Sequence, residues 1–467
     1  MQTIFMEIKL PILPSKQSFA KIKAPHELDL KAICVFMATG FFLDQDTFWK
    51  DEVCLLPGHI HTIDNEGYLI KSTAWFQWHY SPREITFEKA LEEYIELLTT
   101  ITKEQVGDSS VILPLSGGLD SRSQALVFKG LKNKVHSYSY SFQGGYPEHN
   151  ISKQIAEECG FSFESFSIPK SYLWECIEEL SQINKCYSEF THPRQMAVLK
   201  NLRQMKGEFS LGHWGDVFFD RGVPEGTQEK DVMPLLFKKM VKKDGLELAE
   251  QLWKTWEIEG DFKSYFISRL EKILSKINID NLSAKLRVFK TTQWAHRWTS
   301  TNLSVFENAH PIHLPFYDDR MCKFICTIPE DYLADRRLQI AHIKQDNALA
   351  KITWHENKPF NLLNYKYNKI PYNLPYRILG KLKREFKSII GKPEIQRNFE
   401  LQFLGADNDT QLKKYVFENS FLSFVPKHIV NEYYNKFKTK DMVYYSHSLS
   451  MLLTLSVWYQ QYYLKQS

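Results

Sequence analysis

The sequence predicts an α/β fold: a doubly wound parallel sheet, preceded by a small β-rich N-terminal part and followed by a largely helical C-terminal part. Three observations predict this fold. Short apolar runs alternate with helical segments from Ser110 onward, a glycine-rich turn joins the first such run to a helix, and the chain beyond Pro224 reads mainly as helices. Strands that alternate with helices are typical of parallel sheets, which bind ligands at the carboxyl ends of their strands.

The N-terminal part is expected to consist of short strands separated by turns. Between residues 30 and 82, Leu56-Pro57-Gly58 and Asp64-Asn65-Glu66-Gly67 interrupt stretches rich in β-branched and aromatic residues. The composition then changes, and the apolar positions of Ile85–Lys103 recur at helical spacing. An amphipathic helix is therefore predicted there.

The α/β pattern begins with a buried strand at Val111–Leu115 and a helix that starts near Ser121. Three further elements follow, which are a strand at Val135–Phe142, a helix at Asn150–Cys159 and a strand at Ser162–Ile168. We divide the chain into residues 1–84 as a truncated β-rich domain, 85–365 as the α/β domain and 366–467 as a helical extension.

Composition excludes several classes of protein. Of 467 residues, 43% are apolar and the net charge is +4, so no nucleic-acid partner is expected. The basic stretch Tyr376–Arg397 fits either a membrane or nucleic-acid contact or a solvated helix face. Seven scattered cysteines form no Cys-x-x-Cys pair, no apolar run approaches a membrane span, and no signal-peptide core is present. We expect a protein of the reducing cytoplasm.

The most informative segment is Leu115-Ser116-Gly117-Gly118-Leu119-Asp120-Ser121, between the first strand of the α/β pattern and its helix. Two glycines let the backbone approach an anion closely, and exposed amides beside a helix N-terminus form a phosphate site. Asp120 would repel a phosphate unless Mg²⁺ lies between them. The alternative is a tight turn with a capped helix. The segment lacks the Gly-Lys-Ser/Thr ending of a Walker loop.

This segment resembles the pyrophosphate loop of the N-type ATP pyrophosphatases, and of the asparagine synthetase family in particular. Further similar motifs follow in the family's order: the strand Val135–Phe142, Glu148 with the helix after it, Gly212–Phe219, Leu314–Asp318 and Trp354–Phe360. The resemblance covers about residues 110–360 and implies the adenine-nucleotide α-hydrolase-like fold. Relatives include the β-lactam synthetases and the lasso-peptide cyclases.

The resemblance implies ATP and Mg²⁺ as cofactors, with Asp120 and Asp216 as the carboxylates linked to the metal. It also implies a nucleotide site formed by the phosphate loop and two further segments. These residues are Leu115, Ser116, Gly117, Gly118, Leu119, Asp120, Ser121, Tyr140, Leu211 and Gly212.

Several positions depart from the family pattern. His213 stands where asparagine synthetases carry a glutamate, and it is either a base for the incoming amine, with Glu148 as the next candidate, or a loop residue. Trp214 replaces a glycine, and Val217 replaces a glutamate. Asn357 occupies the family's lysine position, so Lys358 is the candidate catalytic lysine, with Lys366 or Lys369 as substitutes.

The resemblance implies an ATP-dependent ligase that adenylates a carboxylate and transfers it to ammonia or an amine. Gln2 stands where the family's glutaminase domain has its nucleophilic cysteine, so no glutaminase activity is expected. The nitrogen then comes from an amine substrate or from a separate ammonia-supplying subunit. Alternatives are a degenerate nucleotide-binding homologue with a binding or regulatory role, or another enzyme of the superfamily, such as one that modifies tRNA.

Overall fold

The structure is a computed structural model that describes residues 5–143, 147–190, 193–355, 358–390 and 400–466, with only the backbone at a few of them. Its strands are β1 Phe5–Lys9, β2 Phe19–Lys21, β3 Glu52–Cys54, β4 His59–Asp64, β5 Leu69–Ala74, β6 Val111–Pro114, β7 Val135–Phe142, β8 Ser162–Ile168, β9 Glu208–Ser210, β10 Ile312–His313, β11 Thr353–His355 and β12 Lys358–Asn361.

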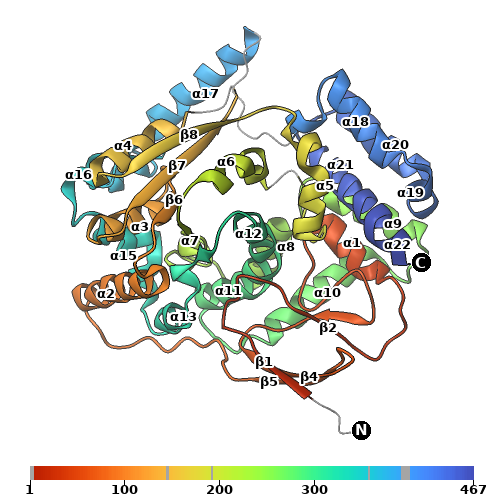
Figure 1. Cartoon of the computed structure of the whole chain (residues 1–467), viewed down its shortest axis with the longest axis horizontal. Coiled ribbons are helices and arrows are strands. Elements are labelled where there is room, and N and C mark those ends of the chain that lie inside the picture. The colour runs from red at the N-terminus through yellow and green to blue at the C-terminus, as the bar shows by residue number, and fades with distance from the viewer. Residues whose placement is uncertain (1–4, 144–146, 191–192, 356–357, 391–399, 467) are drawn as a thin grey trace.

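Helices account for most of the remaining chain (Figure 1). The α-helices up to the end of β9 are α1 Leu30–Thr39, α2 Phe87–Val106, α3 Leu119–Lys129, α4 His149–Cys159, α5 Tyr172–Asn184 and α6 Leu199–Gln204. Those after β9 are α7 Gly215–Phe218, α8 Glu229–Met240, α9 Gly245–Thr255, α10 Phe262–Ser275, α11 Leu282–Lys290, α12 Ser300–Glu307, α13 Asp319–Ile325, α14 Glu330–Leu333, α15 Arg337–Ile343, α16 Asn347–Lys351, α17 Leu374–Ile389, α18 Ala406–Val416, α19 Asn419–Phe424, α20 Lys427–Thr439, α21 Ser446–Trp458 and α22 Leu464–Gln466. A π-helix, η2, spans Thr291–Thr299, between α11 and α12.

The central sheet has five parallel strands in the order β10-β9-β6-β7-β8. Its strand order reverses beside β6, because β7 and β8 follow on one side and β9 and β10 on the other. Side chains of β6 alternate between the two faces, as a pleated strand requires. Ile112 packs in the same core as α2, whereas Val111 and Leu113 pack with α3 and α4. The predicted doubly wound α/β fold is therefore confirmed.

One prediction in the N-terminal part is wrong. Residues 30–82 were expected to form only short strands, but Leu30–Thr39 is the helix α1. Eight of its ten residues are buried, so it has no polar face from which a helical period could be read. Asp29 caps the helix by accepting a hydrogen bond from the Ala32 amide, and Gly40 ends it in the left-handed conformation. Strands β1, β4 and β5 do form a small antiparallel sheet.

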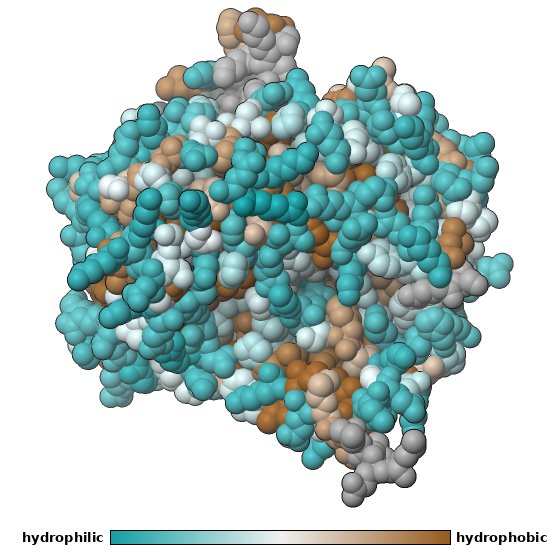
Figure 2. All heavy atoms as spheres, in the orientation of Figure 1, coloured by the Kyte–Doolittle hydropathy of each residue, from teal (hydrophilic) through white to brown (hydrophobic). Residues whose placement is uncertain are grey.

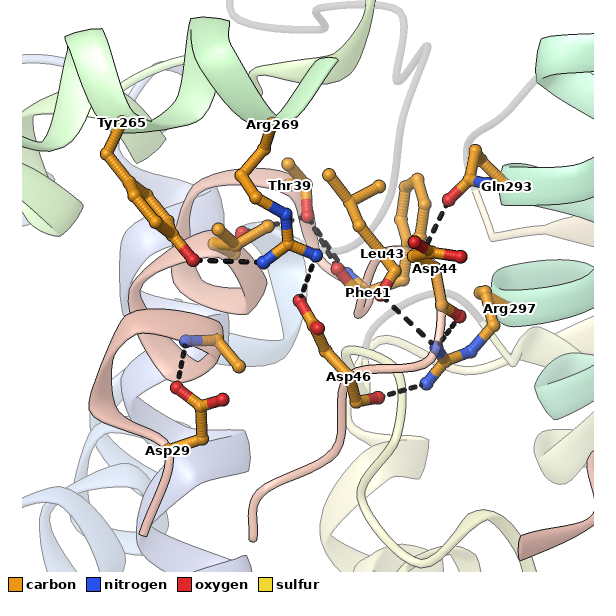
Figure 3. A network of polar contacts seen from close by, with 12 residues as sticks. Asp29, Thr39, Phe41, Leu43, Asp44, Asp46, Tyr265, Arg269, Gln293 and Arg297 are labelled. Atoms are coloured by element: carbon orange, nitrogen blue, oxygen red, sulfur yellow. Dashed lines mark hydrogen bonds and ion pairs between the residues drawn. The ribbon is translucent and has the colours of Figure 1, made fainter. Parts of the chain in front are cut away.

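Helix α1 lies in the core of the helical half of the molecule, where it packs against α9 and α21. The following turn is held by the π-helix η2, as Figure 3 shows. The buried Arg297 guanidinium donates to the carbonyl oxygens of Leu43, Asp44 and Asp46. Gln293 accepts from the Asp44 amide at 2.7 Å. The N-terminal residues are thus bonded to an element some 250 positions later.

Burial explains the state of the cysteines. All seven cysteines are free thiols, and burial raises the pKa of Cys159 and of Cys176 to about 12, which keeps both thiols protonated at neutral pH.

Within the described ranges, no helix combines the length and the apolar character that a membrane crossing requires.

Candidate active site

The candidate site lies where the order of the central strands reverses. Strands β6 and β9 are neighbours there, and their carboxyl ends lead into the phosphate loop and into the segment Leu211–Asp216. Connections leave such a point in opposite directions, which opens a crevice in which doubly wound proteins bind their ligands. The two motifs that the sequence analysis placed in one nucleotide site therefore meet at this edge of the sheet.

The phosphate loop is closed by its own two hydroxyls. The Ser121 hydroxyl accepts from the Ser116 amide at 3.2 Å, and the Ser116 hydroxyl accepts from the Gly118 amide at 3.2 Å. The strand end is fixed because the Leu115 amide donates to the Tyr138 carbonyl of β7 at 2.8 Å. These bonds turn the backbone sharply before α3 begins at Leu119.

Glu148 lies against this loop. Its carboxylate accepts a hydrogen bond of 2.9 Å from the Gly117 amide. A carboxylate at this amide demonstrates that the loop has a donor directed at an anion, which is what a phosphate site requires. The role predicted for Glu148, that of an alternative base, stays a prediction; the residue stands at the start of α4, against the phosphate loop.

Asp120 is the residue on which the two loops converge. A Cβ added at Gly212 would lie 3.0 Å from the Asp120 Cβ, and one added at Gly215 would lie 2.5 Å from Asp120 Oδ1. Both glycines are therefore required for this close approach. The Asp216 amide donates to Asp120, while the Asp216 side chain is exposed. The pKa of Asp120 is raised to about 6, chiefly by burial; the Arg336 charge opposes this rise, and the nearby Asp216 charge adds to it.

Arg336 and Gln339 complete the surroundings of Asp120, and neither residue belongs to a motif in the sequence. The Arg336 guanidinium forms an ion pair with Asp120, and the Gln339 amide donates to Asp120 Oδ1 at 2.8 Å. Asp335 and Arg336 both adopt the left-handed backbone conformation, with φ of 57° and 63°. This strained turn aims Arg336 at the site, and no motif in the sequence signals it.

A second arginine links the phosphate loop to the segment that carries the candidate lysine. Arg122 is buried, and its guanidinium donates to the Gly117 carbonyl at 3.2 Å and to the Thr353 carbonyl of β11 at 2.8 Å. Strand β11 pairs with β12, which begins at Lys358. The Lys358 side chain and residue Asn357 lie outside the described part of the structure, so the lysine assignment stays a prediction. Lys366 and Lys369 are exposed, and Lys369 pairs with Asp335 at 2.6 Å.

His213 follows Gly212 and lies edge-on to the Phe306 ring, with the ring centres 5.8 Å apart. Burial lowers the pKa of His213 to about 4, and the Asp216 charge only partly opposes this. Its Nδ1 is buried and has no hydrogen-bond partner among the described residues. The imidazole is therefore neutral at pH 7, with one unsatisfied nitrogen.

Trp214 occupies a backbone position that favours glycine. Its φ is 78°, in the left-handed region, which costs a residue with a Cβ about 1–2 kcal/mol. The indole is nearly buried and donates to the Thr291 hydroxyl of η2 at 3.0 Å. Packing and this hydrogen bond offset the backbone strain, so a tryptophan holds the loop where the family pattern has glycine.

Replacing Trp214 tests this balance. Trp214→Gly removes the strain but also the packing of a buried tryptophan, a loss of about 3–5 kcal/mol. We expect a net loss of about 2–3 kcal/mol, measured as a lower midpoint in denaturant unfolding. Trp214→Phe keeps the strain and loses the indole bond, which costs about 1 kcal/mol. A glycine variant as stable as the parent would contradict this account.

Other predicted nucleotide contacts occupy suitable strand ends. Tyr140 is near the carboxyl end of β7, where its hydroxyl accepts from Gln195 at 3.5 Å, and burial raises its pKa. Leu211 is buried directly after β9, and its amide donates to the His313 carbonyl at 2.9 Å. Asp318, from the fourth family motif, caps α13 and binds Arg320 instead of entering the site. These nucleotide roles stay predictions.

Comparisons with known proteins bear on the same segment. The family model described as "Asparagine synthase" matches residues 93–219, from α2 through both loops. No curated protein matches the chain. Two solved structures are similar to part of the chain: an NMN synthetase from Francisella tularensis and a glutamine-dependent NAD⁺ synthetase from Acinetobacter baumannii in complex with ADP.

The two structural likenesses are distant. The first has 13% identity and a TM-score of 0.23, and covers 44% of this chain and 93% of the other. The second has 14% identity and a TM-score of 0.19, and covers 38% of this chain and 39% of the other. Scores this low add nothing to the family match, which stands on the sequence and on the two loops that meet at Asp120. Residues 93–219 of this chain are therefore similar to the asparagine synthase family over the segment that holds both loops.

Proposed function

We propose that this protein is an ATP-dependent ligase that adenylates a carboxylate and then transfers the acyl group to an amine or to ammonia. The observation that carries the proposal is the convergence of the phosphate loop and the Leu211–Asp216 segment on Asp120. The asparagine synthase family match over both loops supports the same reaction class.

In the first step, a carboxylate oxygen forms a bond to the α-phosphorus of ATP. The bond from that phosphorus to the bridging α–β oxygen breaks, and pyrophosphate leaves with the electron pair. The negative charge that develops on the leaving group needs fixed donors. The Gly117 amide, which already holds a carboxylate, is such a donor, and Arg336 supplies a positive charge beside Asp120.

The residues present fit the Mg²⁺ that the family implies. Asp216 raises the pKa of Asp120 through like charge, in addition to burial, and a divalent cation between the two carboxylates would relieve that repulsion. Asp120 and Asp216 would hold the ion, which would neutralise charge on the phosphates.

In the second step, the amine nitrogen attacks the acyl carbon and AMP leaves with the electron pair of the C–O bond. The nitrogen must lose a proton as the amide forms. His213 follows Gly212, is neutral at pH 7, and has an unpartnered ring nitrogen among the described residues. We assign it the role of proton acceptor. An amine substrate fits this step without any second subunit, whereas an ammonia donor would have to be supplied separately.

A second candidate, nucleotide binding without turnover, is favoured by one observation. Asp120 Oδ1 already bonds Arg336 and Gln339, so the carboxylate proposed to hold the metal has its charge compensated within the protein. A chain that had lost catalysis could retain such a site to bind ATP alone.

The products of ATP cleavage distinguish these proposals. We expect AMP and pyrophosphate in equal amounts when the purified chain is incubated with ATP, Mg²⁺ and a panel of carboxylates and amines, separated by ion-exchange chromatography. ADP and phosphate would contradict adenylation. Saturable ATP binding with no pyrophosphate on any substrate would instead support the second candidate. Incubation with glutamine alone is the matched control, and we expect no glutamate from it.

A further inference from the structure

The basic stretch Tyr376–Arg397 lies on helix α17, Leu374–Ile389, up to the end of that helix, and residues 391–399 lie outside the described part of the structure. The described chain leaves the apolar face of α17 uncovered. Its large apolar side chains are between 45% and 82% exposed. Helix α21, by contrast, is buried along its whole length. The exposed apolar residues of α17 are Leu374, Ile378, Leu379, Leu382, Phe386 and Ile389.

These six residues share one side of the helix. At 3.6 residues per turn, their positions fall within a stripe of about 140°. Arg377, Lys381 and Lys383 lie outside this stripe and are exposed, and the sequence adds Arg384 and Lys387 at positions on the same polar side. Glu385 is the single acidic residue of the helix; it falls within the stripe, between Leu374 and Ile378, and pairs with Lys381 at 3.7 Å. The helix thus combines a broad apolar face with an excess of positive charge.

The position of α17 makes this face accessible. Figure 1 shows the helix extending away from α4 and β8 at the edge of the molecule, and Figure 2 shows apolar residues, in brown, on the projection at its far end. Ile370 and Tyr372, which precede the helix, are 62% and 57% exposed and enlarge the apolar surface. Exposed apolar patches of this kind mark interaction sites.

We propose that α17 binds the surface of an anionic lipid membrane, lying in the plane of the interface. A wide apolar face beneath a polar face rich in lysine and arginine is the division that such helices require. The apolar residues enter the boundary between headgroups and acyl chains, and the basic side chains reach the anionic headgroups. The charge excess favours an anionic surface over a neutral one.

The base of α17 is fixed to the candidate site, so membrane binding would orient the site. The Tyr376 ring packs edge-on against Phe360 of β12, with the ring centres 5.3 Å apart. Just before the helix, Lys369 pairs with Asp335, whose neighbour Arg336 contacts Asp120. A helix bound to lipid would therefore hold strand β12 and the turn at Asp335 and Arg336 close to the lipid surface.

Sedimentation of the full chain with vesicles tests the proposal. We expect binding to vesicles of phosphatidylcholine and phosphatidylserine, little binding to phosphatidylcholine alone, and weaker binding as salt rises. The variant Arg377→Gln/Lys381→Gln/Lys383→Gln should bind anionic vesicles about 100-fold more weakly, at about fivefold per charge removed. Leu382→Glu/Phe386→Glu should abolish binding to both vesicle types.

The matched control is Lys254→Gln/Lys272→Gln/Lys414→Gln, which removes the same charge from exposed positions on α9, α10 and α18.

An equal loss of vesicle binding in the two charge variants would overturn the assignment to α17. An absence of binding to anionic vesicles at low salt would overturn it as well. A change from dimer to monomer in Leu382→Glu/Phe386→Glu, without vesicle binding by the parent, would assign the face to a second copy of the chain and reject the membrane. Pyrophosphate exchange in solution should be unchanged in every α17 variant, which separates this test from that of the proposed reaction.

Discussion

Asp120→Asn is expected to reduce ATP-dependent turnover by at least about 10²-fold, because it removes a charge placed where the phosphates and metal are proposed to lie. The fold should persist. Burial of the charged form raises the pKa of Asp120 to about 6, so the neutral amide avoids the cost of burying a carboxylate at pH 7. Arg336 keeps its contact with Gln339. We therefore expect a thermal midpoint equal to or above that of the parent.

Asp335→Asn is the matched control for this experiment. Asp335 precedes Arg336, is itself an acidic residue of the same turn, and pairs with Lys369 away from the phosphate loop. Its replacement should leave turnover within a fewfold of the parent, since an exposed ion pair contributes about 0–1 kcal/mol. If the two variants lost activity equally, the effect would belong to the turn around Arg336 and not to the Asp120 carboxylate.

His213→Ala is expected to slow amide formation by about 10²-fold while the enzyme still exchanges labelled pyrophosphate into ATP with the correct carboxylate. Adenylation needs no proton acceptor, whereas attack by the amine does. The expected loss in the rate of amide formation lies at the lower end of the range for removal of a general base, because a histidine with a pKa of about 4 is a weak base. Equal loss of exchange and amide formation would mean that His213 positions the loop.

The pH dependence provides a second readout for His213. The neutral imidazole is the active form, so its contribution should rise with pH near 4 and be complete by about pH 6. Between pH 6 and pH 8, the difference between parent and His213→Ala should therefore stay constant. His136→Ala, at the amino end of β7 and away from the site, is the control. A histidine limb near pH 6.5 that disappears in His213→Ala would contradict a neutral imidazole with a lowered pKa.

The sequence predicted the central sheet well because its signals are local. Strands β7 and β8 match their predicted bounds, and the glycine-rich turn after β6 identified both the strand end and the following helix. Alternation of short strands with helices fixes the sheet as parallel, and the strand order then determines where a ligand binds. The elements that were predicted worst lack such a local signal in the sequence. Helix α1 is the example, because a helix that is buried on all sides shows no periodicity of apolar and polar residues.

The candidate site was only partly predictable. The loop residues around Asp120 follow from a motif, but Arg336 reaches Asp120 across 216 positions through a left-handed turn that no residue pattern encodes. The sequence identified Trp214 as a departure from glycine, yet only the structure shows the positive φ that makes glycine the natural choice. The low pKa of His213 depends on burial by distant residues such as Phe306, which spacing cannot reveal.

The bonds between Arg297 and the turn after α1 have a consequence for dissecting this protein. Removing residues 1–84, the part we divided from the rest on sequence grounds, would leave the Arg297 guanidinium in the interior without the carbonyl oxygens of Leu43, Asp44 and Asp46. It would also open a void where the apolar residues of α1 fill the core beside α9 and α21. An unpaired interior cation and a cavity of that size each disfavour folding. Residues 1–84 and the helical half of the molecule therefore share one core, and we expect neither part to fold when it is expressed without the other.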